Sequence, residues 1–110
     1  MDLRWDQRCF WEEMDEDQEL AQELVELFLS SSAKLLEELE EALEQGNFAR
    51  LKEKAHSLKV AAGTIYLEGV RQRALALEKG VSPEEALKII AELRELCAIF
   101  GREVEKLLSS

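Results

Sequence analysis

The sequence predicts an all-α protein, an antiparallel four-helix bundle with a short N-terminal capping helix. The 110 residues include one proline and five glycines, so few positions break a helix. Between the breaks, apolar residues recur at steps of three and four, the period of an amphipathic helix. Only two strong turn signals interrupt this pattern, and short connections make neighbouring helices antiparallel. We expect a single domain over residues 1–110.

The two turn signals have clear chemical causes. At Gly46-Asn47, glycine can close one helix in the left-handed conformation and asparagine can cap the next. At residues 80–85, Gly80 can end a helix, Ser82 and Glu85 can form a capping box, and proline suits the first helical turn between them. A weaker break is expected near residues 63–66, where β-branched and aromatic residues follow a glycine.

Four segments between these breaks carry an apolar stripe, and we expect the stripes to form the core. From about residue 17 to 44 the stripe is Leu20, Leu24, Leu27, Phe28, Leu35, Leu39 and Ala42, and from residue 47 it is Phe48, Leu51, Ala55, Leu58, Ala62 and Ile65. A shorter helix after Tyr66 carries Leu67, Val70, Ala74 and Leu77, and from Pro83 the last stripe is Leu87, Ile90, Leu93, Cys97, Phe100, Val104 and Leu107.

The segment from Arg4 to Met14 is rich in aromatic residues: Trp5, Phe10 and Trp11. We interpret it as a short helix that covers the open end of the bundle, because that end otherwise exposes apolar core. A partner-binding patch is the alternative.

Composition narrows the classes of partner and compartment. A formal net charge of −10 disfavours nucleic acid and anionic membranes as partners. No apolar run approaches 18 residues and no charged-then-apolar leader is present, so we expect a cytoplasmic protein without membrane insertion. Cys9 and Cys97 stand far apart without a CxxC partner, which favours free thiols over a disulfide and predicts no metal site. Met1 favours a complete protein over an excised domain.

His56, the single histidine of the chain, is predicted to lie outside the core. On a helical wheel its side chain points about 130° away from the centre of the apolar stripe. Lys52, Lys59, Val60 and Gly63 lie around it at i−4, i+3, i+4 and i+7. An exposed imidazole is largely neutral near pH 7 and offers a nitrogen nucleophile.

The charge around His56 differs in sign from that of the whole chain. Residues 50–59 contain Arg50, Lys52, Lys54 and Lys59 against Glu53, a local net charge of +3. Lysine ammonium groups stabilise phosphate oxygens as point charges. We therefore expect a positive surface around His56 that suits a transient phosphate.

Residues 55–63, AHSLKVAAG, resemble the AHxLKGxAG signature of histidine phosphotransfer (HPt) domains. The stretch from Asp17 to Leu29 resembles the acidic opening of that family and its ELxxLF segment, and residues 46–48 resemble its G(D/N)-aromatic turn. The resemblance covers nearly the whole chain. It implies a helical bundle without a nucleotide site, whose histidine accepts a phosphoryl group from a receiver-domain aspartate and returns it to another receiver.

The resemblance also assigns roles to individual residues. His56 is the expected phosphoacceptor, and Lys59 matches the lysine that stabilises the transferred group. Lys52, Val60 and Gly63 are the expected docking surface, with Gly63 permitting close backbone approach. Glu78 aligns with a polar residue that contacts the imidazole in some members. Mg²⁺ is expected in the receiver only, so this chain needs no cofactor of its own.

Two positions depart from the family pattern. Val60 stands where the family usually has glycine, one turn after His56, and Tyr66 stands at a second family glycine. Either residue can adapt the docking surface to one receiver or hinder transfer, and Tyr66 can also simply pack at the turn.

The function expected from these observations is that of a monomeric phosphoryl carrier of a two-component phosphorelay, whose partners are response-regulator receiver domains and a hybrid histidine kinase. The first alternative is a module of the same fold that binds receivers or kinases without efficient transfer. The second is a purely structural helical bundle. An ordinary enzyme is disfavoured, since the sequence has no phosphate loop and no recognisable nucleophile–base pair.

Overall fold

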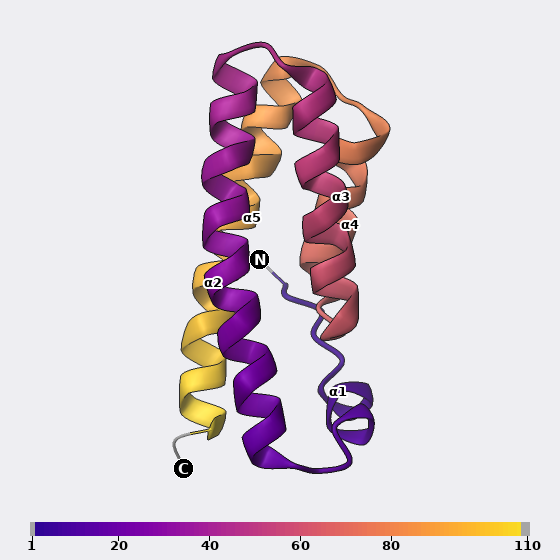
Figure 1. Cartoon of the computed structure of the whole chain (residues 1–110), viewed down its shortest axis with the longest axis vertical. Helices are drawn as coiled ribbons and strands as arrows, with labels where there is room; N and C mark the ends of the chain where they lie inside the picture. The colour runs from indigo at the N-terminus through magenta and orange to yellow at the C-terminus, as the bar shows by residue number, and fades with distance from the viewer. Residues whose placement is uncertain (1, 109–110) are drawn as a thin grey trace.

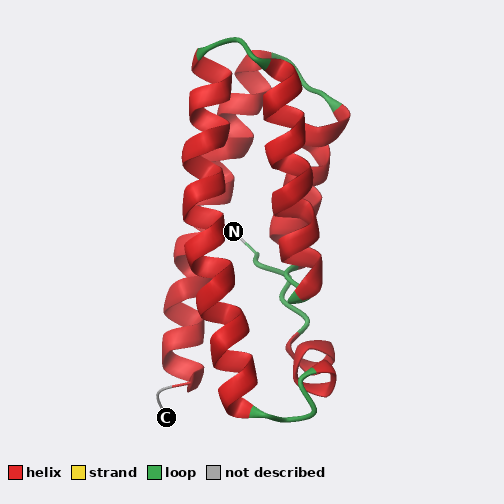
Figure 2. Ribbon diagram, viewed as in Figure 1, coloured by secondary structure: helices red, strands yellow, loops and turns green. Residues whose placement is uncertain are grey.

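The computed structural model describes residues 2–108, which form a bundle of helices joined by short loops (Figures 1 and 2). The helices are α1 (Gln7–Glu13), α2 (Gln18–Glu44), α3 (Phe48–Thr64), α4 (Glu68–Lys79) and α5 (Pro83–Leu108). The long helices α2 and α5 pack side by side, and the shorter α3–α4 hairpin packs against both. α1 lies beyond the end of the hairpin where α3 stops (Figure 1). The predicted four-helix bundle with a capping helix is confirmed.

Both strong turn signals act as expected. Gly46 and Gly80 have φ values of 67° and 106°, the left-handed region that favours glycine. The Asn47 side chain accepts a 3.1 Å hydrogen bond from the Arg50 backbone N–H and so caps α3. The Ser82 hydroxyl accepts from the Glu85 backbone N–H at 3.2 Å at the start of α5. The Asn47 cap marks the start of α3, Gly80 ends α4, and the Ser82 cap marks the start of α5.

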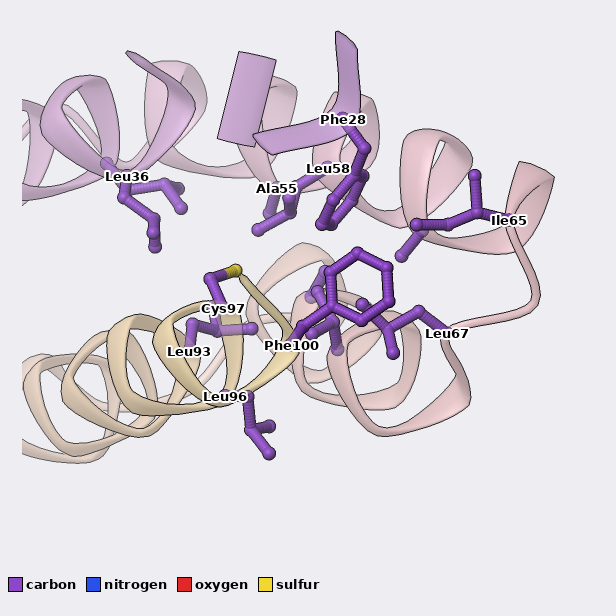
Figure 3. Packing of buried hydrophobic residues seen from close by; sticks show 14 of the residues in the cluster. Phe28, Leu36, Ala55, Leu58, Ile65, Leu67, Leu93, Leu96, Cys97 and Phe100 are labelled. Atoms are coloured by element: carbon purple, nitrogen blue, oxygen red, sulfur yellow. The ribbon is translucent and has the colours of Figure 1, made fainter. Parts of the chain in front are cut away.

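The core lies between α2, α3, α4 and α5 (Figure 3). Phe28 of α2 and Phe100 of α5 meet edge to face with ring centroids 5.6 Å apart, beside Leu58 of α3. Apolar burial of this kind contributes about 25 cal/mol per Å² and is the main force that holds the helices together. Cys97 is buried in this core, and Cys9 and Cys97 are both free.

Five predicted core residues lie at the surface instead: Leu20, Leu27, Phe48, Leu87 and Leu107. In α2 the neighbouring positions Ala21, Val25, Ser32 and Leu36 are buried. α2 carries apolar residues on two adjacent faces, and the packing of α3 and α5 decides which face is covered. The prediction of the stripe was therefore wrong at these positions, although the helix itself was predicted correctly.

The N-terminal segment is extended before it becomes helical. The helix begins at Gln7 rather than at Arg4, and Trp5 pairs with Leu67 in an isolated antiparallel bridge. Leu3 and Arg4 carbonyls accept hydrogen bonds from the N–H groups at the start of α4, Gly69 at 2.8 Å and Glu68 at 3.2 Å. Residues 2–6, which we call the N-terminal clasp, thereby satisfy backbone donors that a helix start leaves open.

Candidate functional site

α3 presents His56 on its outer side. Its inner side packs into the core through Leu51, Ala55, Leu58 and Ala62. The His56 side chain is 56% exposed, as the helical wheel predicts. An imidazole on a capped, well-packed helix has a fixed backbone and an accessible ring, which are the two requirements for a nucleophile that meets a partner protein.

Glu78 of α4 contacts both His56 and Lys59. Its Oε2 lies 2.5 Å from His56 Nδ1, and its Oε1 accepts a 2.6 Å hydrogen bond from Lys59 Nζ. An ionised carboxylate only accepts hydrogen bonds, so Nδ1 carries the hydrogen. In the neutral ring Nε2 then holds a free lone pair, and the ring orientation is set by Glu78.

The charge of Glu78 is stabilised by these neighbours. The hydrogen bond from Lys59 is the largest influence and lowers the pKa of the Glu78 carboxyl; partial burial opposes it, and the contact with His56 lowers the pKa further. Glu78 is therefore ionised near neutral pH and acts as a fixed acceptor between the two side chains.

The remaining cations near His56 in the sequence are divided between two sides of α3. Arg50 and Lys54 turn toward α2, where both pair with Glu38. Lys52 lies on the α4 side, with its Nζ 3.3 Å from where a Cβ at Gly80 would stand. The expected positive surface around His56 therefore reduces to Lys52 and Lys59. Local net charge cannot reveal this, because residues two apart point in different directions on a helix.

Gly63 and Val60 occupy the same outer region of α3 as His56. Val60 is 53% exposed, one turn beyond the imidazole. A Cβ at Gly63 would meet Arg71 Cδ at 3.6 Å, which is ordinary van der Waals contact. No neighbour among the described residues 2–108 therefore requires glycine at position 63.

Comparison with known families identifies the fold and the class of activity. A sequence model described as the Hpt domain matches residues 23–108. The chain belongs to the Hpt domain family. Hpt domains carry a phosphoryl group in phosphorelays and interact with receiver domains there. No curated protein and no solved structure shows significant similarity to this chain.

The match begins inside α2, so the clasp and α1 lie outside the matched part of this Hpt domain. Tyr66, at the second family glycine, has φ 63° and so retains the left-handed turn without a glycine. Tyr66 lies beside α1. The negative charge of Glu13 in α1 raises the pKa of the Tyr66 phenol. The geometry thus agrees with a packing role for Tyr66 at the turn.

Sequence reasoning missed several features of this Hpt domain. It did not detect that Leu27 is exposed beside α3, nor that Arg71 and Glu68 of α4 form an ion pair of 2.5 Å on the Gly63 side. The i,i+3 spacing of Glu68 and Arg71 could have indicated that pair.

Among residues 2–108, no group of three or more His, Cys, Asp or Glu side chains could hold a metal ion, and none of the helices is long and apolar enough to cross a membrane.

Proposed function

We propose that His56 is the phosphoacceptor of this Hpt domain and shuttles a phosphoryl group between receiver-domain aspartates. The observation that carries this proposal is the contact of His56 Nδ1 with Glu78, which leaves Nε2 as the free nucleophilic nitrogen of a half-exposed ring. The family's activity requires such a histidine, and His56 is the single histidine of the sequence.

In the transfer step, the Nε2 lone pair attacks the phosphorus of an aspartyl phosphate. The new N–P bond forms as the P–O bond to the aspartate breaks, and the aspartate leaves as a carboxylate. Glu78 keeps the ring hydrogen on Nδ1 and stabilises the positive charge that develops on the ring. The reverse attack by another receiver's aspartate returns the phosphoryl group.

Lys59 is the group that would neutralise the phosphoryl oxygens during transfer. Its ammonium is held by Glu78 at 2.6 Å, three residues after His56 on α3. An ammonium has three donors, so Lys59 can keep Glu78 and still donate to a phosphate on Nε2. The acidic pocket and its Mg²⁺ belong to the receiver, which leaves this chain to supply an oriented nucleophile and one cation.

The partners that we propose are response-regulator receiver domains and a hybrid histidine kinase, met in the cytoplasm by a monomer of this chain. The formal net charge of −10 supports protein partners over nucleic acid or an anionic membrane.

The experiment is a labelling assay with a panel of purified receiver domains, each charged with ³²P-phosphate. Wild type should take up label that is stable in base and labile in acid, as expected for a phosphorus–nitrogen bond. His56→Gln should take up none. Ser57→Ala is the matched control, because it removes the adjacent exposed hydroxyl and should leave labelling unchanged. Wild type that accepts no label from any receiver of the panel contradicts the proposal.

One observation favours a second candidate, a docking module that transfers poorly. Val60 is exposed one turn from His56, where its isopropyl group can crowd an incoming receiver. If crowding limits the reaction, Val60→Gly raises the rate of labelling at saturating receiver. An unchanged or lower rate removes this candidate.

A further inference from the structure

A groove lies between residues 22–29 of α2 and residues 101–108 of α5, and we call it the α2–α5 groove. The helices pack around the bundle in the order α2, α3, α4 and α5, and α5 packs against α2 to close it. His56 meets Glu78 where α3 packs against α4, whereas the groove lies where α5 packs against α2. It is toward the end of the bundle at which α2 and α5 extend beyond the α3–α4 hairpin (Figure 1). The groove and His56 therefore belong to opposite sides of the molecule.

The α2–α5 groove has an apolar floor and an acidic rim. Its volume is about 380 Å³. The floor consists of buried and half-buried apolar side chains, Val25 and Leu29 of α2 and Val104 and Leu108 of α5. The exposed side chains of Glu26 on one wall and Glu105 on the other form the rim. An apolar floor with a few charged groups at its edge is the usual composition of a binding groove.

Gly101 keeps the groove open. It lies in the interior of α5, where glycine is less favourable than alanine because it loses more conformational freedom on folding. A Cβ at position 101 would stand 3.7 Å from Leu29 Cδ2, which is ordinary van der Waals contact. The packing of α5 against α2 within residues 2–108 therefore tolerates a side chain at this position. What the glycine provides is free volume at the floor of the groove.

The sequence on the α2 side of the groove is strongly acidic. Residues 9–33 include eight Asp and Glu residues and no Lys or Arg, and they contain the half of α2 that lines the groove. On α5, the neighbouring cations Arg102 and Lys106 do not line it. An apolar surface with this charge at its edge attracts a cationic partner and repels an anionic one.

We infer that the α2–α5 groove binds a cationic amphipathic helix of another protein. Both walls are α-helices, whose backbone groups bond within the helix, so an extended peptide would gain no main-chain hydrogen bonds there. A helix satisfies its own backbone, and its apolar residues at i, i+3, i+4 and i+7 match a groove about 10 Å long. Lys or Arg residues at the edges of that apolar face would meet Glu26 and Glu105.

A second copy of the chain is the competing occupant, and its charges oppose it. Two molecules that each carry a formal charge of −10 repel one another. The cationic stretch of the chain, residues 50–59 of α3, packs its apolar residues Leu51, Ala55 and Leu58 into the core, so it has no free apolar face for the groove. The occupant is therefore a different protein. Because the groove is opposite His56, that protein can stay bound while a receiver contacts His56.

The probe for this site is a synthetic amphipathic peptide of leucine and lysine, about four helical turns long and held helical by a side-chain crosslink. Its leucines stand at i, i+3, i+4 and i+7, and fluorescence anisotropy measures its Kd for the full chain. A peptide of the same composition with its leucines spread around the helix is the control for charge alone. It should bind at least about tenfold more weakly, because it presents no apolar face to the floor.

The floor is tested by filling it. Gly101→Leu places a side chain in the free volume and should weaken peptide binding about tenfold. Ala91→Leu is the matched control, because it introduces the same side chain at an exposed position of α5 outside the groove. It should leave the Kd unchanged. Circular dichroism checks that both variants keep the helical fold.

The rim is tested by removing its charge. The double variant Glu26→Gln with Glu105→Gln should weaken peptide binding about fivefold at low salt. Its matched control is Glu37→Gln with Glu95→Gln, which removes the same charge from exposed positions of the same two helices outside the groove. The control should change the Kd by less than about twofold. Added salt should weaken wild-type binding more than binding by the rim variant.

Three results would overturn the inference. Unchanged binding by Gly101→Leu would show that the peptide does not enter the groove. Equal weakening in the two double variants would show that only the total charge attracts the peptide. A wild type that sediments as a dimer and dissociates on Gly101→Leu would make a second copy the occupant.

The inference does not depend on the proposed function. His56→Gln should bind the peptide with the Kd of wild type, and saturating peptide should leave the rate at which a receiver labels wild type unchanged. A peptide that slows labelling would bind at the His56 surface and contradict the inference. A wild type that no receiver labels refutes the proposed function alone, because the binding measurements need no phosphate.

Discussion

α4 is held against the rest of the bundle at its two ends by different kinds of interaction. At its N-terminal end, the backbone of the clasp accepts hydrogen bonds from Glu68 and Gly69 N–H groups, and aromatic rings cover the contact. At its C-terminal end, the Glu78 carboxylate reaches across to Lys59 and His56 on α3. The first end is built on backbone hydrogen bonds and ring contacts around the buried Gly69, while the second is built on charged side chains that are partly exposed.

The buried end has the features of a structural contact. Trp5 donates its indole N–H to the Ile65 carbonyl at 2.9 Å, and its ring meets Phe100 edge to face with centroids 4.9 Å apart. The Asp6 backbone N–H donates to the Tyr66 carbonyl at 3.0 Å. Buried polar groups that are paired in this way are costly to disrupt, since the partner left behind is unsatisfied.

The exposed end has the features of a functional contact. Exposed ion pairs contribute little to stability, because water screens them and both side chains lose freedom. Glu78 nevertheless makes two short contacts, and one of them is with the single histidine of the chain. The comparison indicates that the clasp stabilises the fold, whereas Glu78 adjusts the reactivity of His56.

The largest expected effect is at Glu78. Glu78→Ala should slow transfer at saturating receiver about 10- to 100-fold, because the ring hydrogen is no longer held on Nδ1 and the developing charge is unsupported. Glu78→Gln should recover part of the rate, since its amide oxygen can still accept from Nδ1. Rapid-quench labelling measures both. Equal rates in all three proteins would show that Glu78 does not act on His56.

Gly69→Ala tests the contact between the start of α4 and the clasp, as Glu78→Ala tests the contact at the other end of α4. A Cβ at position 69 would stand 2.5 Å from the Leu3 carbonyl oxygen, so the clasp must shift away from α4. We expect a loss of about 2 kcal/mol in the free energy of unfolding, with transfer by the folded protein unchanged. Urea denaturation followed by circular dichroism measures the loss.

Gly63→Ala is the matched control for this substitution. Position 63 lies within α3, and the added methyl would meet Arg71 Cδ of α4 at 3.6 Å, an ordinary contact. It should leave stability unchanged or raise it by up to about 1 kcal/mol through helix propensity. If the contact between the clasp and α4 does not contribute to stability, the Gly69→Ala and Gly63→Ala variants will be equally stable.

A smaller effect is expected from Trp5→Phe. Phenylalanine keeps most of the ring contact with Phe100 and loses the hydrogen bond to the Ile65 carbonyl. Unfolding free energy should fall by about 1 kcal/mol, again without a change in transfer. A transfer rate that falls together with stability would mean that the clasp also positions His56.

The smallest effect is the pH dependence of stability at Glu78. Because Lys59 lowers the pKa of the Glu78 carboxyl in the folded protein, its contribution is present above the pKa of the unfolded chain and is lost as pH falls through the folded value. The urea midpoints of wild type and Glu78→Gln should differ by a constant amount above the ordinary pKa range of glutamate and converge as the pH falls through the lowered pKa of the folded protein. A difference that grows on acidification would contradict the sign of this pKa shift.

The sequence by itself determined the helices and the exposure of His56. Caps and left-handed glycines act within a few residues, so Gly46, Asn47, Gly80 and Ser82 could be identified from local chemistry. The helical period alone is sufficient to place His56 opposite Ala55 and Leu58 on α3. The motif around His56 then indicated the family, which the match over residues 23–108 confirmed.

Only the tertiary structure decided which neighbours these helices meet. Leu27 belongs to the apolar stripe of α2, yet it is exposed and lines a depression that Ala61 of α3 also lines. Arg50 and Lys54 are close to His56 in sequence, yet both pair with Glu38 on the α2 side of α3, away from Glu78 and Lys59 on the α4 side. Periodicity defines a direction around one helix axis. The packing of helices against one another decides which element lies in that direction. For this reason, only the folded bundle shows which flank of His56 is apolar and which is charged.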